Sequence, residues 1–261
     1  MPHHSHIRKG TSQPIGLDRV SDEEWALYQT VIRTVRSAGH RFVLGGAFAL
    51  ATYTGQYRNT KDLDLFILPE TRDAIVELLT QCGLQDYYDE EPYDRGWIYR
   101  AVCEGTIVDV IWTTANRHGT VDEAWLTRGP EIEIRGERVR IMPVEDLIWV
   151  KLYILHRDRC DWTDVLNLLY AAGPTLDWEH LLQRVGEDWR LLAGSLSVFA
   201  WMCPGRAASL PRWVWERLSL PAPVESSALD VDRRRVDLLD TRPWFVPVLE
   251  PGEEPFSEPA A

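Results

Sequence analysis

The first half of the chain alternates segments that resemble short strands with segments that resemble helices. Strands are expected where apolar side chains recur at every second position, and helices where they recur every three or four positions. A helix over 21–37 opens with the capping pair Ser21 and Glu24. The other elements expected in this half are strands at 41–44, 63–68, 97–103 and 106–113, helices at 47–53 and 70–81, and a hairpin at 131–134 and 138–141.

From residue 144 onward the pattern is helical. Helices are expected at 144–157, 162–171, 178–185 and 189–202, with a short piece near Trp213. Mixed elements followed by helices predict an α/β (α+β) protein, with a small mixed-sheet domain over 21–143 and a helical domain over 144–220. Residues 1–20 are expected to form a flexible leader. Residues 221–261, rich in Pro, Glu and Asp, are expected to form an extended, partly disordered tail.

Composition narrows the class of protein. The formal net charge of -12 argues against a protein that coats nucleic acid without specificity, because phosphate binding needs clustered Lys and Arg. No segment reaches the roughly 18 to 20 apolar residues of a membrane span, and the first residues lack the apolar core of a secretory signal. A cytoplasmic protein with no membrane partner is therefore expected. The four cysteines form no CxxC pair and are expected to be free thiols.

Two aspartates stand two residues apart in one expected strand. Side chains alternate along a strand, so Asp62 and Asp64 project from one face, while Leu63 projects from the other into the core. Like charges roughly 7 Å apart repel each other, and a divalent cation such as magnesium compensates for this with the oxygen ligands that it prefers. A solvated carboxylate beside an ion pair with Arg58 or Lys61 is the alternative, and this pair of aspartates alone does not decide between the two.

A third aspartate and a glycine pair add to this pattern. Asp109 interrupts the apolar run 107–112, where a charge is unfavourable unless it is paired or binds a metal. Arg100, on the adjacent expected strand, is the alternative partner. Gly45 and Gly46 stand at a strand-to-helix turn, where backbone amides can approach a phosphate. Neither a GxxxxGK[ST] nor a GxGxxG motif occurs in the sequence.

One lysine lies in an otherwise apolar helix. Because the helix over 144–157 is apolar nearly all round, Lys151 must reach solvent or an anion. The anion is either a nucleotide phosphate or the carboxylate of Asp161 or Asp164, and the sequence leaves both open.

These residues together resemble the DNA polymerase β nucleotidyltransferase superfamily, in particular small bacterial members such as antibiotic-modifying and abortive-infection toxin-like enzymes. The likeness covers roughly residues 40–170, from the glycine turn through the Asp-x-Asp strand and the later aspartate to a helix with a central lysine followed by Asp-x-x-Asp. One departure is Cys160, which stands where the family pattern has a basic residue. The role of Asp161 and Asp164 is therefore open.

The resemblance implies an enzyme that moves a nucleoside monophosphate from a triphosphate such as ATP to an acceptor hydroxyl and releases pyrophosphate. It implies two magnesium ions at the catalytic residues Asp62, Asp64 and Asp109, of which Asp109 could also accept the hydroxyl proton. A small molecule, a tRNA end and a protein are all compatible acceptors. Nucleotide contacts are expected from Gly45, Gly46, Arg58, Thr60 and Lys151.

Two other functions are consistent with parts of the pattern. Metal-dependent glycosyltransferases also use Asp-x-Asp, although those sites usually follow a longer Rossmann-like stretch than the single strand–turn–helix unit expected here. A degenerate member could bind nucleotide without turnover, but the intact set of three aspartates disfavours this hypothesis.

Overall fold

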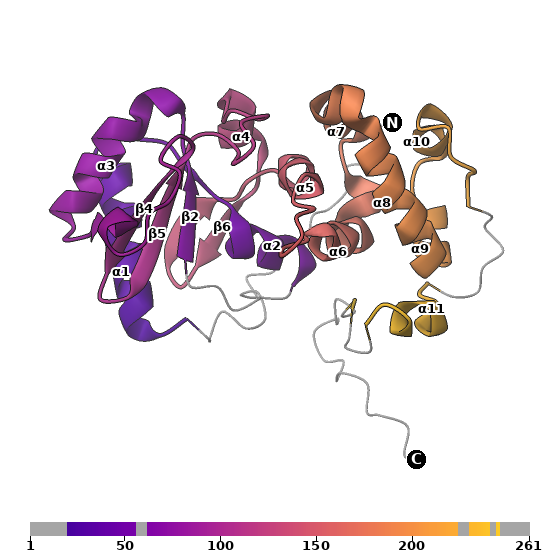
Figure 1. Ribbon diagram of the computed structural model, residues 1–261, viewed down its shortest axis with the longest axis horizontal. Coiled ribbons are helices and arrows are strands. Elements are labelled where there is room, and N and C mark those ends of the chain that lie inside the picture. The colour runs from indigo at the N-terminus through magenta and orange to yellow at the C-terminus, as the bar shows by residue number, and fades with distance from the viewer. Residues whose placement is uncertain (1–19, 56–61, 224–229, 241–243, 246–261) are drawn as a thin grey trace, which may run out of the picture.

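The computed structural model describes residues 20–55, 62–223, 230–240 and 244–245. An α/β half and a helical half lie side by side (Figure 1). The α/β half holds a five-stranded sheet, which confirms the predicted mixed-sheet fold. Its strands, in spatial order, are β1 (Val43–Leu44), β2 (Asp62–Phe66), β5 (Thr106–Ile111), β4 (Ile98–Cys103) and β3 (Gln85–Asp86).

The sheet is mixed because β2 and β5 run parallel, whereas the other neighbouring pairs are antiparallel. The Glu104-Gly105 turn joins β4 to β5 as a hairpin, and both of its residues have positive φ. The register pairs Asp64 with Asp109 across the parallel strands, and Arg100 with Asp109 across the hairpin. Three charged side chains are thus brought to adjacent positions by backbone pairing alone.

Helices cover the sheet and connect it to the second half. Contacts with β5 come from α1 (Asp22–Ser37) and α3 (Arg72–Gln81), which also contact each other. Helix α2 (Gly46–Thr54) contacts β2 and also α5 (Val144–Leu152) and α6 (Trp162–Ala172). It therefore links the sheet to the helical half.

The remaining elements of the α/β half are a short helix and a hairpin. These are α4 (Glu123–Arg128), β6 (Glu131–Ile134) and β7 (Glu137–Arg140). After the hairpin, the Met142 amide donates to the Leu44 carbonyl at 2.9 Å, which extends β1 at the sheet edge. The helix α4 was not expected from the sequence. Its cap is Asp122, whose side chain accepts from the Ala124 amide.

The helical half follows the predicted order with shorter additional pieces. Beyond α5 and α6 it contains α7 (Trp178–Val185), α8 (Trp189–Met202), α9 (Pro204–Ala208), α10 (Arg212–Arg217) and α11 (Arg233–Asp237). Single 3-10 turns occupy Pro69–Thr71 and Tyr87–Asp89 in the α/β half, and Gly173–Thr175 and Gly186–Asp188 in the helical half. Within the described ranges, every helix is too short or too polar to cross a bilayer.

Two expectations need correction. The helix predicted to reach Arg157 ends at Leu152, because the chain turns back there and the Asp161 amide donates to the Ile154 carbonyl at 2.9 Å. The tail expected to be extended contains α11, in which Val236 is buried. The predicted leader, apart from Val20, and the predicted disorder of 249–261 lie outside the described residues.

The tryptophans of the helical half divide between core and surface. Trp149, Trp178 and Trp215 are buried, as core packing predicts. Trp201 and Trp213 expose more than a third of their surface.

Candidate active site

Three carboxylates converge where β2 lies beside β5. Asp62, Asp64 and Asp109 each offer one oxygen, and these oxygens lie within 4.8 Å of one another. Asp62 and Asp64 alternate with the fully buried Leu63 and Leu65, as the period of a strand requires. The structure therefore brings together the three aspartates singled out in the sequence.

A single guanidinium contacts two of these carboxylates. Arg100 on β4 binds Asp109 through both ends of its fork, with Nε 2.8 Å from Oδ1 and Nη2 2.6 Å from Oδ2. The same Nη2 lies 3.7 Å from Asp62 Oδ2. Arg100, the alternative partner considered for Asp109, is thus present together with the acidic cluster. We call Asp62, Asp64, Asp109 and Arg100 the sheet cluster.

Burial and repulsion make negative charge unfavourable in the sheet cluster. Desolvation raises the pKa of Asp64 well above its usual range, and repulsion from Asp62 and Asp109 raises it further. Desolvation also raises the pKa of Asp109, which is only 2% exposed, although its pairing with Arg100 acts in the opposite direction. Three hard oxygen ligands whose charge Arg100 offsets only in part are a suitable site for a divalent cation.

The glycine pair supports the acidic strand directly. Gly46 begins α2 with φ +48°, and a Cβ at this position would lie 1.7 Å from Asp64 Oδ2. A Cβ on Gly45 would lie 2.2 Å from the Phe66 ring. The Gly45 amide donates to the Asp64 carbonyl at 3.1 Å, so it belongs to the pairing of β1 with β2. Both positions therefore require glycine, because β2 lies too close to leave room for a Cβ.

Lys151 lies in a cluster of its own. Its ammonium donates to Asp161 Oδ2 at 2.8 Å and to Asp164 Oδ2 at 2.7 Å, and all three side chains are buried. The sequence left two possible partners for Lys151, a nucleotide phosphate or these carboxylates, and the structure shows the contact with the carboxylates. A contact with nucleotide phosphate stays a prediction.

The basic residue missing at Cys160 is supplied one position earlier. Arg159 donates from Nε to Asp161 Oδ1 at 2.9 Å and from Nη2 to Oδ2 at 3.0 Å. Together with Lys151 it lowers the pKa of Asp161 to about 2, against the effect of burial. The bridge between Leu155 and Cys160 closes a turn that directs Arg159 back toward Asp161. The spacing of these residues in the sequence did not indicate this turn. We call Lys151, Arg159, Asp161 and Asp164 the helix cluster.

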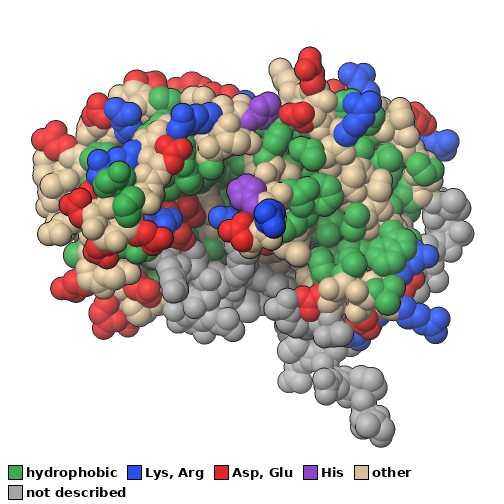
Figure 2. Space-filling view, viewed as in Figure 1, with side chains coloured by type: hydrophobic (Ala, Val, Ile, Leu, Met, Phe, Trp, Pro, Cys, Tyr) green, Lys and Arg blue, Asp and Glu red, His purple; other side chains and the backbone are tan. Residues whose placement is uncertain are grey.

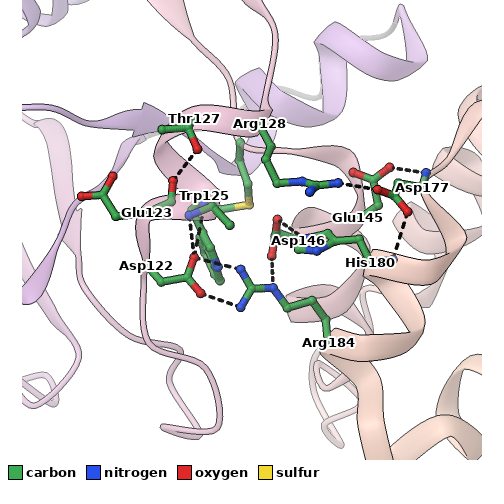
Figure 3. Close-up of polar contacts among 12 residues, drawn as sticks. Asp122, Glu123, Trp125, Thr127, Arg128, Glu145, Asp146, Asp177, His180 and Arg184 are labelled. Atoms are coloured by element: carbon green, nitrogen blue, oxygen red, sulfur yellow. Dashed lines mark hydrogen bonds and ion pairs between the residues drawn. The ribbon is translucent and has the colours of Figure 1, made fainter.

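A third polar network joins the two halves and was not anticipated (Figure 3). Arg184 on α7 binds Asp122 through Nη1 and Nη2 at 2.6 and 2.9 Å. Its Nε lies 2.7 Å from Oδ1 of the fully buried Asp146, and His180 Nε2 lies 3.2 Å from Oδ2 of the same carboxylate. Asp122 precedes α4 and Asp146 belongs to α5, so the network fixes α7 to the end of the α/β half.

The surface between the two halves is hollowed (Figure 2). Acidic side chains meet basic ones and a histidine along this depression. At the junction of the halves, His118 from the loop after β5 meets Tyr153 at 3.0 Å, and the Tyr153 hydroxyl donates to Asp188 at 2.8 Å. Both halves therefore contribute polar side chains to the region between them.

Two of the predicted nucleotide contacts, Arg58 and Thr60, lie outside the described residues. The roles assigned to Asp62, Asp64, Asp109, Gly45, Gly46 and Lys151 stay predictions.

Comparison with known proteins places the chain in a family. The model of a family described as uncharacterised nucleotidyltransferase matches residues 27–197, which include all of the sheet cluster and the helix cluster. No curated protein matches the sequence.

Several solved structures share a partial likeness. The solution structure of the antibiotic-resistance factor ANT(2'')-Ia is 17% identical and has a TM-score of 0.47, with 67% of this chain and 95% of that chain covered. The lincomycin-bound lincosamide antibiotic adenylyltransferase LnuA is 16% identical with a TM-score of 0.40, over 57% and 96%. A putative nucleotidyltransferase from H. pylori is 16% identical with a TM-score of 0.38, over 80% and 86%. The family match covers well over half of the chain, and the chain therefore belongs to this nucleotidyltransferase family.

Proposed function

We propose that this chain transfers a nucleoside monophosphate from a nucleoside triphosphate to an acceptor hydroxyl with the help of magnesium, releasing pyrophosphate. One observation carries the proposal. Oxygens of Asp62, Asp64 and Asp109 meet within 4.8 Å, inside the segment matched by the nucleotidyltransferase family.

The donor set fits two magnesium ions. Asp62, Asp64 and Asp109 would hold the ions, because all three offer hard carboxylate oxygens that meet within 4.8 Å. Bound magnesium would supply charge neutralisation at the phosphate oxygens and orientation of the two reactants.

The protein's own groups would handle the proton and the orientation. Asp109 is the candidate acceptor for the proton of the attacking hydroxyl, at one of its carboxylate oxygens. In the metal-free protein, burial raises the pKa of Asp109, although its pairing with Arg100 acts in the opposite direction. The fork of Arg100 holds the plane of this carboxylate, so the oxygen that takes the proton has a fixed direction.

The nucleotide contacts follow from the elements around the acidic strand. Gly46 at the start of α2 lies beside Asp64, and we propose that its amide faces the triphosphate. Lys151, Arg58 and Thr60 would add positive charge and a hydroxyl. ATP is the triphosphate to test first. The acceptor hydroxyl would belong to a small molecule, a tRNA or a protein. We place this activity in the cytoplasm, since all four cysteines are free thiols.

The test offers the four labelled nucleoside triphosphates with magnesium and pooled acceptors, and follows the label. We expect label in an acceptor, pyrophosphate in equal amount, and loss of both on chelation of the metal. The Asp64→Asn variant should lose transfer, whereas Asp73→Asn, which changes an exposed aspartate on α3, should retain it.

Two outcomes would contradict the proposal. Release of a nucleoside diphosphate from a nucleotide sugar without any pyrophosphate would indicate a glycosyltransferase. Magnesium-dependent nucleotide binding that yields no product with any acceptor pool would indicate a binding protein that has lost turnover. Wild-type-like transfer by Asp64→Asn would remove the site assignment itself.

A further inference from the structure

The edge strand β3 covers only part of β4, and a tyrosine side chain takes its place beside Arg100. Strand β3 contains two residues, whose partners on β4 are Val102 and Ala101. Arg100 is the next residue of β4 and lies past the end of β3. Its amide donates to the Tyr93 hydroxyl at 2.9 Å, and its carbonyl oxygen lies 3.4 Å from the same hydroxyl. One side chain therefore contacts both backbone groups that a longer neighbouring strand would bind.

The Tyr93 hydroxyl is itself held in place. It donates to Asp86 Oδ1 at 2.9 Å, and Asp86 Oδ2 accepts from Arg95 Nη2 at 2.6 Å. Asp86 is the last residue of β3, so these hydrogen bonds connect the end of that strand to Arg100. The Tyr93 ring packs against the core, and its burial raises the pKa of the hydroxyl to about 12. The hydroxyl therefore keeps its proton near neutral pH and remains a donor to Asp86.

The direction of the Arg100 backbone affects where its side chain lies. Because the Arg100 amide donates to Tyr93, it points away from β5, and Arg100 faces Asp109 as a pair without backbone hydrogen bonds. The side chains of such a pair lie closer together than those of a hydrogen-bonded pair. Across this short separation the guanidinium reaches both oxygens of Asp109, at 2.8 and 2.6 Å. A rotation of the Arg100 backbone would therefore move the guanidinium relative to the carboxylate that it holds.

We propose that Tyr93 is a positioning residue, whose hydroxyl fixes the backbone of Arg100 and thereby the direction from which the guanidinium holds Asp109. The inference rests on the proposed function, since that function makes Asp109 a metal ligand and the proton acceptor. Tyr93 acts only through Arg100. Groups that orient a metal ligand in this way typically contribute about 10- to 100-fold to activity.

The first experiment follows the Arg100 side chain in the metal-free protein. Nitrogen-15 NMR detects the Nε–H groups of arginines, and the Arg100 signal is assigned by its loss in Arg100→Lys. In the wild type we expect this proton to exchange slowly with water, because Nε–H donates to Asp109. Tyr93→Phe keeps the ring and removes the hydroxyl. It should shift the Arg100 signal and speed its exchange with water.

The second experiment measures transfer from the labelled triphosphate. We expect Tyr93→Phe to lower kcat per folded molecule by roughly tenfold and to leave the KM for the triphosphate within about twofold of the wild type, because the loss acts on the orientation of Asp109. The matched control is Tyr88→Phe, which changes an exposed ring of the same loop that packs on Arg95 and edge-on against Tyr93. It should leave both the Arg100 signal and kcat unchanged.

Three results would overturn the inference. The first is an Arg100 signal in Tyr93→Phe that matches the wild type. The second is a shifted signal with an unchanged kcat, because the position of the guanidinium would then not matter for the reaction. The third is an equal change in Tyr88→Phe, because packing of the loop and not the Tyr93 hydroxyl would then be the cause.

The NMR measurement separates the inference from the proposed function, since it needs neither metal nor turnover. If no triphosphate serves as a donor for the wild type but Tyr93→Phe shifts the Arg100 signal, the proposed reaction fails and the hold of Tyr93 on Arg100 stands. If transfer occurs and neither the signal nor kcat responds to Tyr93→Phe, only the inference fails.

Discussion

The sheet cluster and the helix cluster are built from the same kinds of residues, but they differ in charge balance. In the helix cluster, Asp161 and Asp164 face Lys151 and Arg159, so two negative charges meet two positive ones. In the sheet cluster, three carboxylates lie together and Arg100 contacts two of them, Asp62 and Asp109. Helix α2 contacts both β2, which carries two of these carboxylates, and α6, which begins beside Asp161.

The pKa values respond to this difference in opposite directions. The pKa of Asp161 falls to about 2, because Arg159 and Lys151 together outweigh its burial. The pKa of Asp64 rises well above its usual range, because burial and repulsion outweigh the attraction of Lys151 and Arg100. The cationic partners of Asp161 lower its pKa, whereas the carboxylates around Asp64 raise its pKa, an effect that a bound cation would reverse. This contrast distinguishes a structural site from a candidate metal site.

The largest expected effect separates activity from stability in the sheet cluster. Asp64→Asn removes a proposed metal ligand and one of the repelling charges. We expect transfer to fall by roughly a thousandfold or more. The metal-free protein should instead melt about 2 to 4 °C higher, corresponding to about 1 kcal/mol. Thermal melting in a chelator and the labelled-triphosphate assay measure the two effects.

The same substitution in the helix cluster should act in the opposite way on the fold. Asp161→Asn removes a carboxylate that two cations hold, and the metal-free protein should lose stability. If Asp64→Asn and Asp161→Asn destabilised the metal-free protein equally, the difference in charge balance would have no energetic meaning.

The next effect is the loss of the buried ammonium. Lys151→Met keeps the length of the side chain but leaves two buried carboxylates with less compensation. Breaking a buried pair in this way costs about 3 to 5 kcal/mol. Urea denaturation measures this loss. The control Arg212→Met, in an exposed pair with Glu216, should stay within about 0.5 kcal/mol of the wild type.

A small effect of Lys151→Met on stability, together with a large rise in the KM for the triphosphate, would contradict the structural role of the ion pair. It would favour the other partner that the sequence left open, a nucleotide phosphate. The Kd for a triphosphate, measured without acceptor for Lys151→Met and for the wild type, separates the two roles.

Much of the sheet cluster follows from local sequence rules. Alternation along a strand places Asp62 and Asp64 on one face, and the Glu104-Gly105 hairpin places Arg100 opposite Asp109. Each of these inferences needs only the period of a strand and the position of one turn. They were accessible because neither depends on contacts between distant helices.

The helix cluster was less accessible because it depends on where a helix ends. The apolar pattern continues past Leu152, and nothing local marks the turn that brings Arg159 and Asp161 back to Lys151. Tertiary ion pairs determine the end of α5 here. The same holds for the junction of Arg184 with Asp122 and Asp146, each of which lies more than 30 residues from Arg184 in the sequence.

A third prediction tests whether the acidic strand needs the close approach of α2. Gly46→Ala forces an alanine into the left-handed backbone region. Its Cβ would lie 1.7 Å from Asp64 Oδ2, and the Asp64 carboxylate must therefore move. We expect a loss of about 2 to 3 kcal/mol from backbone strain and overpacking. Mn²⁺ binding should weaken as well. The control Gly39→Ala shares a positive φ but meets nothing within 4 Å, so it isolates the cost of backbone strain.

Equal effects of Gly46→Ala and Gly39→Ala on stability, with unchanged Mn²⁺ affinity, would show that the contact between Gly46 and Asp64 is unimportant. The glycine would then be needed for its backbone conformation alone.

The smallest effect is a dependence on pH whose sign differs between the clusters. The folded-state pKa of Asp161 is below its ordinary value near 3.8, so its contribution is fully present above that value and is lost as pH falls toward about 2. The stability difference between wild type and Asp161→Asn should therefore shrink by about 2 kcal/mol across this window.

The folded-state pKa of Asp64 is raised, so its ionisation destabilises the fold above that pKa. Lowering the pH should thus stabilise the metal-free wild type relative to Asp64→Asn. Chemical denaturation at a series of pH values measures both stability differences. If both changed with pH in the same direction, the charge of the sheet cluster would be compensated within the protein, and the cluster would need no metal.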